Sequence, residues 1–357
     1  MNLTPEMKTQ LAEQKKQCVF CKLISGEMPA KKVFVDKITV AMLDIYPALK
    51  GHTLFMLKEH YPIMPYIPAE EFKHYFGILP QLCQAVKKGM VSTAINVFIA
   101  NGGVAGQQSP HFLAHVFPRE QGDGFFNFLF KQGGSLEEAQ VKMLSNNFNL
   151  MMQNHFSRNP AVWHQGEGAT PDFLEKIKTD DVTIYEDEKV LAVIPEKSAA
   201  KGHIVIYSKD EKRYIEKLAT PDAEHLFFAA SFAATAVFEG LGAQGTNIIL
   251  KSGITDDNPE GRLVLHILPR MPGDHLQSLL WQPKQPSYNV DSVMSKIKDN
   301  TWSIKSEAKE EEKSEAKGEV KIEAVVKKKV IINNYDLKGK KLSPEEEIRR
   351  AIEGMQR

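Results

Sequence analysis

The stretch FLAHVFPREQGD, residues 112–123, decides the fold, because it returns later in the chain as LVLHILPRMPGD, residues 263–274. Both copies have the pattern of a β-strand in which apolar side chains surround one histidine, and both contain Pro-Arg after that strand. The upstream motifs are repeated as well, since Lys-Gly-His precedes an apolar strand at residues 50–52 and again at 201–203. A repeat unit longer than 100 residues predicts two whole domains of one kind and not a solenoid.

The composition is that of an ordinary globular protein. The 357 residues are 42% hydrophobic and 25% charged with a formal net charge of zero, so charge gives no reason to expect binding to nucleic acid or membranes. No apolar run reaches the ~20 residues that cross a membrane, and residues 1–17 lack the apolar core of a secretory signal. Three cysteines make no disulfide framework, and we expect a cytoplasmic protein.

Each repeat mixes strand and helix patterns, which indicates an α+β fold. In the first repeat, residues 31–45 and 51–61 resemble strands, and residues 68–90 have helical spacing with acids early and lysines late. Residues 305–329 are rich in lysine and glutamate, as in a linker, and Ser343 begins a capping box that predicts a tail helix. We expect an N-terminal arm over 1–17, a first domain over 18–131, a helical connector over 132–169, a second domain over 170–284, a charged linker over 285–340 and a tail helix over 341–357.

Cys18 and Cys21 form a C-x-x-C pair near the start of the first domain. In a chain of this kind the pair can be a redox couple, half of a metal site or two small buried residues. As a metal site it needs two more ligands, for which His60 and His111 are the natural candidates, and Cys₂His₂ is a common closed set for zinc. The spacing alone does not decide between zinc and burial.

Residues 111, 113 and 115 share one face of the predicted strand, because alternate residues of a strand point the same way. Two histidines therefore flank Leu113, either as a catalytic strand without its middle residue or as inert, hydrogen-bonded side chains. The loop before them, NGGVAGQQS at residues 101–109, can bring backbone N–H groups close to an anion, or it can be a hairpin that needs glycine for its φ angles.

The ordered motifs CVFC, AMLDIYPALKGHTLFMLKEHY and NGGVAGQQSPHFLAHVFPR closely resemble those of the histidine-triad superfamily, over residues 18–131. Residues 170–280 resemble it more faintly. The resemblance implies two domains, each an antiparallel sheet with helices packed on it, paired as a pseudo-dimer within a monomeric chain and followed by a charged C-terminal tail. Members of the superfamily bind nucleotides and attack an α-phosphate.

The family motif is His-x-His-x-His, and its middle histidine is the nucleophile. In this chain those positions hold His111, Leu113 and His115. Leucine has no lone pair to attack phosphorus, so the covalent route is closed. The second repeat has Val264 at the middle position, preceded by Arg262. The resemblance thus implies that the nucleophile is replaced in both domains, with His115 left as a phosphate contact.

The resemblance also assigns ligands in the first domain. It implies a structural Zn²⁺ held by Cys18, Cys21, His60 and His111. It implies a nucleotide pocket in which apolar residues receive the base, an acid holds the ribose, and polar residues surround the phosphates. The implied pocket residues are Val19, Phe20, Leu23, Asp44, Asn101, Gln107, Gln108 and His115.

The second repeat departs further from the family pattern. Glu211 replaces the zinc histidine and Pro195 replaces the ribose acid. Asp256 and Asp257 lie in the phosphate loop, where two carboxylates would repel an anion. We interpret this repeat as a structural partner of the first.

Three functions remain open at this stage. The first is a module that binds a purine nucleotide or a nucleotide-like ligand without hydrolysing it. The second is an enzyme of altered mechanism, a hydrolase of nucleotide phosphoramidates or dinucleoside polyphosphates or a nucleotidyltransferase, in which His115 promotes direct attack by water. The third is a purely structural protein. The tail suits a protein partner, and nucleic acid is not expected because glutamates nearly balance the lysines there.

Overall fold

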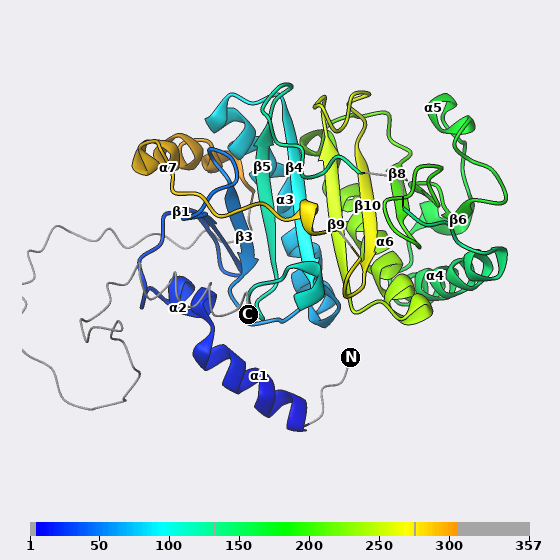
Figure 1. Cartoon of the computed structure of the whole chain (residues 1–357), viewed down its shortest axis with the longest axis horizontal. Helices are drawn as coiled ribbons and strands as arrows, with labels where there is room; N and C mark the ends of the chain where they lie inside the picture. Colours follow the sequence, from blue (N-terminus) through cyan, green and yellow to red (C-terminus); the bar gives the residue numbers. More distant parts are fainter. Residues whose placement is uncertain (1–4, 131–132, 275, 306–357) are drawn as a thin grey trace, which may run out of the picture.

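The computed structural model describes residues 5–130, 133–274 and 276–305. Its centre is one ten-stranded antiparallel sheet with the order β1-β2-β3-β5-β4-β9-β10-β8-β7-β6 (Figure 1). The second five strands repeat the order of the first five in reverse, so the two halves are related by a pseudo-two-fold axis between β4 and β9. Phe98 of β4 lies opposite Ile249 of β9 at this junction. The expected α+β fold with two paired domains of one topology is confirmed.

Each half supplies five strands. Those of the first half are β1 (Lys32–Val35), β2 (Thr39–Leu43), β3 (Thr53–Leu57), β4 (Ala94–Asn101) and β5 (Leu113–Arg119). Those of the second half are β6 (Thr183–Glu186), β7 (Val190–Val193), β8 (Ile204–Ser208), β9 (Gly245–Ser252) and β10 (Val264–Arg270).

The helices include one long helix in each half that packs on the sheet. The α-helices are α1 (Pro5–Gln17), α2 (Val19–Ser25), α3 (Ala69–Met90), α4 (Glu138–Arg158), α5 (Asp172–Glu175), α6 (Thr220–Leu241) and α7 (Val290–Lys298). The short 3₁₀ helices are η1 (Met64–Tyr66), η2 (Gly103–Ala105), η3 (Val162–Gln165), η4 (Ile215–Lys217), η5 (Leu276–Leu279) and η6 (Thr301–Ser303).

The long helices α3 and α6 join the two halves on one face of the sheet. Phe72 of α3 stacks on Phe228 of α6, and Phe76 stacks on Phe227, each pair with ring centroids 4.2 Å apart. Both helices belong to one continuous apolar core that includes strands of both halves. The halves therefore share a core, and neither buries its apolar face alone.

The alternation of β5 places the functional face on the side of the sheet away from these helices. Ala114 and Val116 join the helix-side core, whereas Leu113 and Phe117 join smaller clusters on the other face. This is the period-two pattern of a strand buried on both sides. The predicted common face of residues 113 and 115 is thus the face that carries the site.

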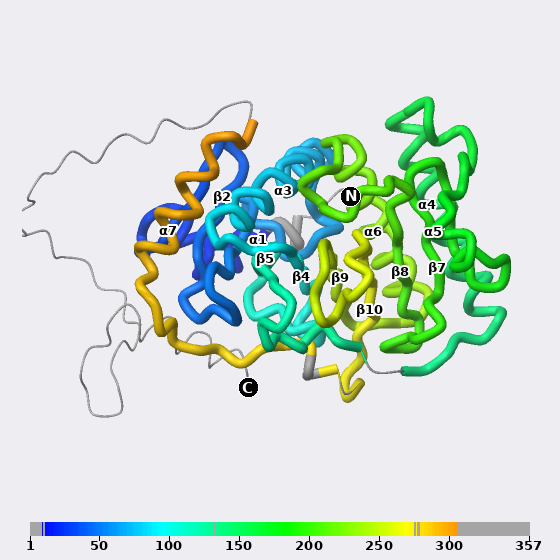
Figure 2. Tube along the Cα trace, turned by 90° about the horizontal axis from the view of Figure 1, so that it is seen from above, coloured from blue at the N-terminus to red at the C-terminus, as the bar shows by residue number. Residues whose placement is uncertain are grey.

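Each half sends a chain segment across to the other. After β5, Phe130 packs on His203 and His266 of the second half, with ring centroids 5.5 and 4.7 Å away. After β10 the chain runs back past the first half to α7, as seen from above in Figure 2. We call residues 276–289 the return strap. Asn127 donates to the backbone oxygen of Leu280 in this strap (3.1 Å).

The charged linker expected over residues 285–340 is wrong in its first part. Residues 290–298 form α7, which contacts β1 and α3, and η6 follows it on α3. The helix forms because Asn289 caps it by accepting from the backbone N–H of Ser292, and because Val293 and Ile297 are buried. Residues 306–357, and with them the tail helix over 341–357, lie outside the described residues. No helix within the described ranges is long and apolar enough to cross a membrane.

Candidate functional site

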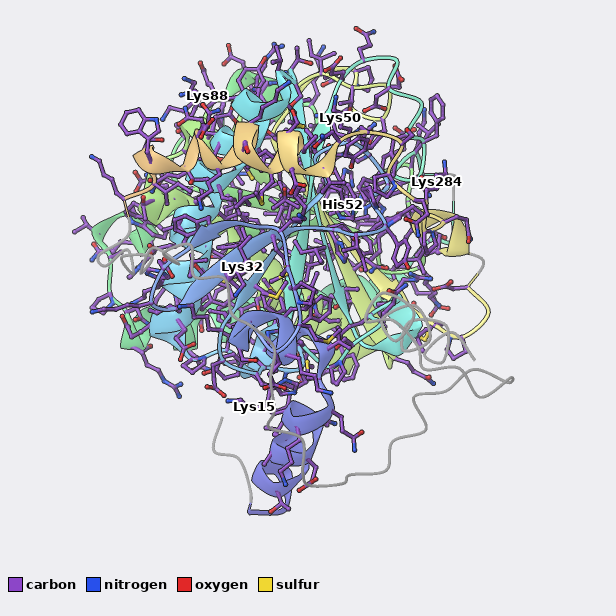
Figure 3. All side chains as sticks on the ribbon, turned by 90° about the vertical axis from the view of Figure 1, so that its left-hand side faces the viewer. Lys15, Lys32, Lys50, His52, Lys88 and Lys284 are labelled. Atoms are coloured by element: carbon purple, nitrogen blue, oxygen red, sulfur yellow. The ribbon has the colours of Figure 1, made fainter. Side chains whose placement is uncertain are left out.

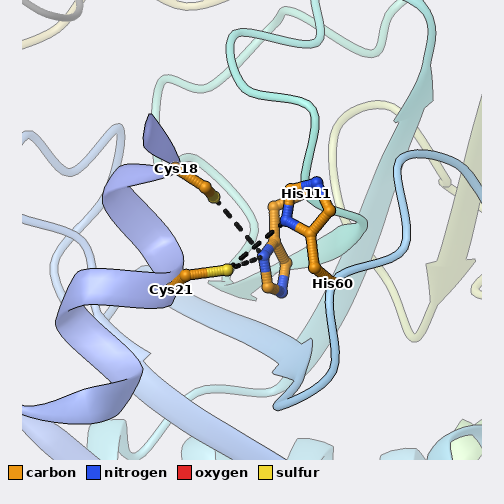
Figure 4. A group of neighbouring side chains, drawn as sticks. All are labelled: Cys18, Cys21, His60 and His111. Carbon is orange, nitrogen blue, oxygen red and sulfur yellow. Dashed lines mark hydrogen bonds between the residues drawn. The ribbon is translucent and has the colours of Figure 1, made fainter. Parts of the chain in front are cut away.

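Cys18, Cys21, His60 and His111 converge beside α2, although they come from three separate parts of the chain (Figure 4). Cys18 is the N-cap residue of α2 and Cys21 lies in its first turn, so both thiols are presented at one helix end. His60 follows β3 and His111 precedes β5, which are neighbouring strands. The four ligand atoms all lie within 4.8 Å of one another.

The distances within this cluster fit a tetrahedral metal ion. Cys21 Sγ lies 3.4 Å from His60 Nδ1 and 3.5 Å from His111 Nδ1, and Cys18 Sγ lies 3.6 Å from His111 Nδ1. Zinc bonds of ~2.3 Å to sulfur and ~2.05 Å to nitrogen at a tetrahedral angle require sulfur–nitrogen separations of about 3.6 Å. His111 Nε2 donates to the backbone oxygen of Leu57 (2.9 Å), which leaves the Nδ1 lone pair facing the thiols.

The two thiols have opposite tendencies to ionise. The hydrogen bond from Cys21 lowers the pKa of Cys18, against the effect of burial and with further help from His111. The same hydrogen bond, together with burial, raises the pKa of Cys21. A thiolate at Cys18 is the form that a metal ion binds.

An apolar cavity of about 100 Å³ lies next to this cluster, between α2 and the strands. Three of the residues that line it, Val19, Phe20 and Leu23, are those expected to receive a base. Met42 and Leu54, which the sequence did not single out, complete it from β2 and β3. In β2 and β3, residues that face the helices alternate with residues that face this cavity, and both faces are buried. This alternation along each strand could have identified Met42 and Leu54 as cavity residues.

A second, more polar cavity, also of about 100 Å³, adjoins the first. Phe20, Asp44 and His115 line both cavities, and Asp44 thus lies at their junction. The backbone N–H of Tyr46 donates to Asp44 Oδ1 (2.8 Å) and holds the carboxylate in place. Burial raises the pKa of Asp44 above its usual range, although the N–H of Tyr46 opposes this. Gln107, Gln108 and Leu113 line the polar cavity as expected.

Two histidines form a hydrogen-bonded pair behind Leu113. Ala48 N–H donates to His52 Nδ1 (3.3 Å), so His52 carries its proton on Nε2 and donates to His115 Nδ1 (3.0 Å). In that tautomer His115 carries its proton on Nε2; Asp44 Oδ2 also lies 3.4 Å from His52 Nδ1. Burial lowers the pKa of both rings to about 3. His52 lies inside the body of the protein, whereas Lys88 and Lys284 lie at its surface (Figure 3). Both rings are therefore neutral at pH 7, and in this tautomer His115 offers an N–H donor to the cavity.

The predicted role of Asn101 is wrong in its geometry. Its side chain is buried away from both cavities, where Oδ1 accepts from the N–H of Met64 (3.1 Å) and Nδ2 donates to Thr246 Oγ1 (3.3 Å). Asn101 thus joins the two halves and does not face a ligand. The last residue of β4 points to the interior because the register of the β4–β9 pair places it opposite Thr246.

The glycine-rich loop uses its own N–H groups internally. Ala105 and Gln107 donate to the backbone oxygen of Gly102, and Gly106 donates to that of Gly103. The Gly102 N–H donates to Gln107 Oε1 (2.7 Å). Positive φ angles of 95° at Gly102 and 87° at Gly106 explain the glycines. Of the two interpretations of this loop, the tight turn is therefore the one that these contacts favour.

Three residues at the polar cavity could not be inferred from the motif. Ser109 lines both cavities, with its hydroxyl 3.7 Å from Cys18 Sγ. Leu280 and Trp281 reach the cavity from the return strap, and the Trp281 ring packs edge-on against His115 and His52 at centroid distances of 4.9 and 5.3 Å. No local pattern in the sequence indicates that this strap crosses to the first half.

In the second half, the loop that corresponds to the glycine-rich loop turns a carboxylate into the interior of the protein. Asp257 points inward and pairs with Arg119 (3.1 Å) and Lys251 (3.2 Å), and all three side chains are buried. The expectation that Asp257 repels an anion in the phosphate loop is wrong, because these cations neutralise it. Attraction to Lys251 and Arg119 holds the pKa of Asp257 below its usual value, although burial acts in the other direction. Glu211 and Pro195 stand where a zinc ligand and a ribose acid would be.

Comparison with known proteins gives matches that centre on the first half. The family model that matches is the HIT domain, over residues 25–122. An uncharacterised HIT-like protein of Methanocaldococcus jannaschii is 40% identical over 107 residues, which are 30% of this chain and 82% of that protein. The adenylylsulfatase HINT3 of Arabidopsis thaliana is 33% identical over 116 residues, 32% of this chain and 59% of that protein. A zinc-bound histidine triad family protein from Mycobacterium smegmatis is 31% identical, covers 31% of this chain and 80% of its own, and gives a TM-score of 0.29.

Proposed function

This chain belongs to the HIT domain family, and on that premise we propose that its first half binds a nucleotide or a nucleotide-like ligand without hydrolysing it. The apolar cavity would receive the base, and Asp44 at the junction would accept from the ribose hydroxyls. Gln107, Gln108 and His115 would meet the 5′ end of the ligand. The second half would act as the structural partner.

The observation that carries this proposal is Leu113 on the wall of the polar cavity, where the motif requires the nucleophile. An aliphatic side chain forms no covalent intermediate. With the His52 proton on Nε2, the tautomer that the Ala48 contact favours, the remaining histidine His115 would hold its own proton on Nε2 and would have no free lone pair there with which to activate water. Direct hydrolysis assisted by His115 is accordingly disfavoured by the same geometry.

We propose that Cys18, Cys21, His60 and His111 hold a structural zinc ion. The donor set, the sulfur–nitrogen distances and the orientation of His111 all support this assignment. Bound zinc would supply folding free energy by tying α2 to the strand ends that carry His60 and His111. Since α2 also provides Val19, Phe20 and Leu23, the same ion would hold one wall of the base cavity in place.

Thermal stabilisation by ligands tests the proposal. Adenosine, guanosine, cytidine, uridine and their monophosphates are added at millimolar concentration, and at least one should raise the melting temperature by mass action. Asp44→Ala should remove the shift, whereas Glu260→Gln, a change at an exposed carboxylate, should keep it. A panel in which no compound shifts the melting temperature refutes the binding role.

A turnover assay tests the absence of hydrolysis. Adenosine 5′-phosphoramidate and diadenosine polyphosphates should remain intact after prolonged incubation with the metal-loaded protein. Turnover above the blank that disappears in His115→Ala would show that the protein is an enzyme of altered mechanism.

A further inference from the structure

The second half of the molecule contributes Leu280 and Trp281 to the wall of the polar cavity. Trp281 contacts His115 and His52 as described, and it also packs edge-on against Phe98 and Phe117, with ring centroids 5.5 and 4.9 Å away. The strap presses directly on the loop that precedes the strand, because a Cβ atom on Gly106 would lie 2.5 Å from Leu280 Cδ2. A phosphate chain that extended past Leu113 would meet these two side chains.

The cavities also lack a cationic side chain that could pair with a phosphate. Of the described residues that line them, none is lysine or arginine, and Asp44 is the only carboxylate. Lys31, on a neighbouring groove, is paired with Asp291 (2.5 Å). The N–H groups of Gly102, Ala105, Gly106 and Gln107 are already donated within their own loop. Because His52 and His115 are neutral, a phosphate there would lose water without gaining a cation.

The remaining polar groups suit an uncharged ligand. Ser109, Gln108 and the Nε2–H of His115 are neutral hydrogen-bonding groups that match a hydroxyl. Each cavity holds about 100 Å³, whereas sites for drug-sized ligands usually exceed ~300 Å³. The pair of cavities is thus suited to a base and a sugar, and not to a dinucleotide.

We propose that the ligand of the first half is a ribonucleoside without a 5′-phosphate, selected by the strap residues Leu280 and Trp281 and by the absence of a cation. This inference rests on the proposed binding function and narrows it to one class of ligand. The nucleoside enters with its base between α2 and the strands, its ribose at Asp44 and its 5′-hydroxyl toward Ser109 and His115. The second half then determines specificity, although its own site is filled.

Calorimetric titration of the full chain with each nucleoside and its 5′-monophosphate tests this inference. For at least one base, the nucleoside should bind ten-fold or more tightly than its monophosphate. Its affinity should change less than two-fold between 0.05 and 0.5 M NaCl, because no charge is recognised. Trp281→Ala should bring the two affinities within about three-fold of each other, since it opens the polar end. Trp302→Ala, which removes an exposed ring, should leave the ratio unchanged.

The outcomes separate the two proposals. If a monophosphate binds as tightly as its nucleoside or more tightly, the inference is overturned while the binding function stands. If no nucleoside and no monophosphate binds, both are overturned. The wild-type ratio decides the matter even if Trp281→Ala does not fold.

Discussion

Replacing Asp257 with asparagine should destabilise the whole protein, because this carboxylate joins the two halves. Asp257 lies in the second half and pairs with Arg119 of the first half and with Lys251 of β9. The substitution keeps the size of the side chain and removes its charge. Arg119 retains Asp123 as a partner at 2.6 Å. Lys251 keeps the backbone oxygens of Phe128 and Asp257 and the ring of Phe130 but no carboxylate, so the loss falls mainly on its buried ammonium group.

The expected loss of unfolding free energy at pH 7 is in the lower part of the range of about 3–5 kcal/mol that leaving one buried charge without its partner usually costs. An independent upper bound comes from deprotonation. Burial already lowers the pKa of Lys251. Releasing its proton at pH 7 costs at most about 4.6 kcal/mol, from an ordinary pKa near ~10.4 and ~1.36 kcal/mol per pH unit. At pH 9 the same bound is about 2 kcal/mol, so the defect should shrink as pH rises.

Urea unfolding of wild type and variant at pH 7 and pH 9 measures this difference. Glu260→Gln makes the same chemical change on an exposed carboxylate of the same loop and should cost less than about 0.5 kcal/mol. The double variant Asp257→Asn with Lys251→Met should recover most of the loss, because both members of the pair are then removed. A loss below 1 kcal/mol in the single variant, or a double variant no more stable than it, would refute this account of the network.

Further outcomes follow from the same contacts. Cys18→Ser should reduce bound zinc from about one ion per chain to near zero in metal analysis, while Cys83→Ala, in the core of α3, should keep it; retained zinc in the first variant would contradict the ligand set. Phe76→Ala should cost about 3–5 kcal/mol and leave a single unfolding transition, since its ring packs on Phe227 across the shared core; two transitions would mean separate cores. Urea unfolding should also show lower stability at pH 5.5 than at pH 7.5. Four buried histidines have lowered pKa values, so the unfolded chain takes up protons below ~6.5 while the folded chain does not, at up to about 1.4 kcal/mol per pH unit each; equal stability at both pH values would contradict this. These histidines are His52, His115, His203 and His266.

Much of the fold follows from local patterns in the chain. The repeated strand around His115 and His266 predicts two domains of one topology, and the period of two within β5 predicts which of its residues share the functional face. These features depend only on neighbours along the chain, where backbone geometry relates spacing to direction.

Other features could not be inferred in this way. Asn101 looked like a ligand contact from its place in the loop, but the pairing of β4 with β9 turns it toward Thr246. Asp257 was expected to repel an anion in the phosphate loop, but its carboxylate pairs with the buried Arg119 and Lys251. In both cases the deciding partner lies in the other half or on another strand, beyond the reach of local spacing.

The amino-acid sequence by itself determined the duplication and the faces of the strands, because both are properties of spacing and residue type, and its resemblance to the histidine-triad superfamily placed Leu113 at the nucleophile position. Only the tertiary structure decided that the strap with Trp281 crosses to the first half while Phe130 crosses to the second. It also decided that α7 covers β1 where a charged linker was expected. The physical reason is that an apolar side chain in a connecting segment gains the same burial free energy against any apolar surface. Which surface it reaches is set by the path of the whole chain.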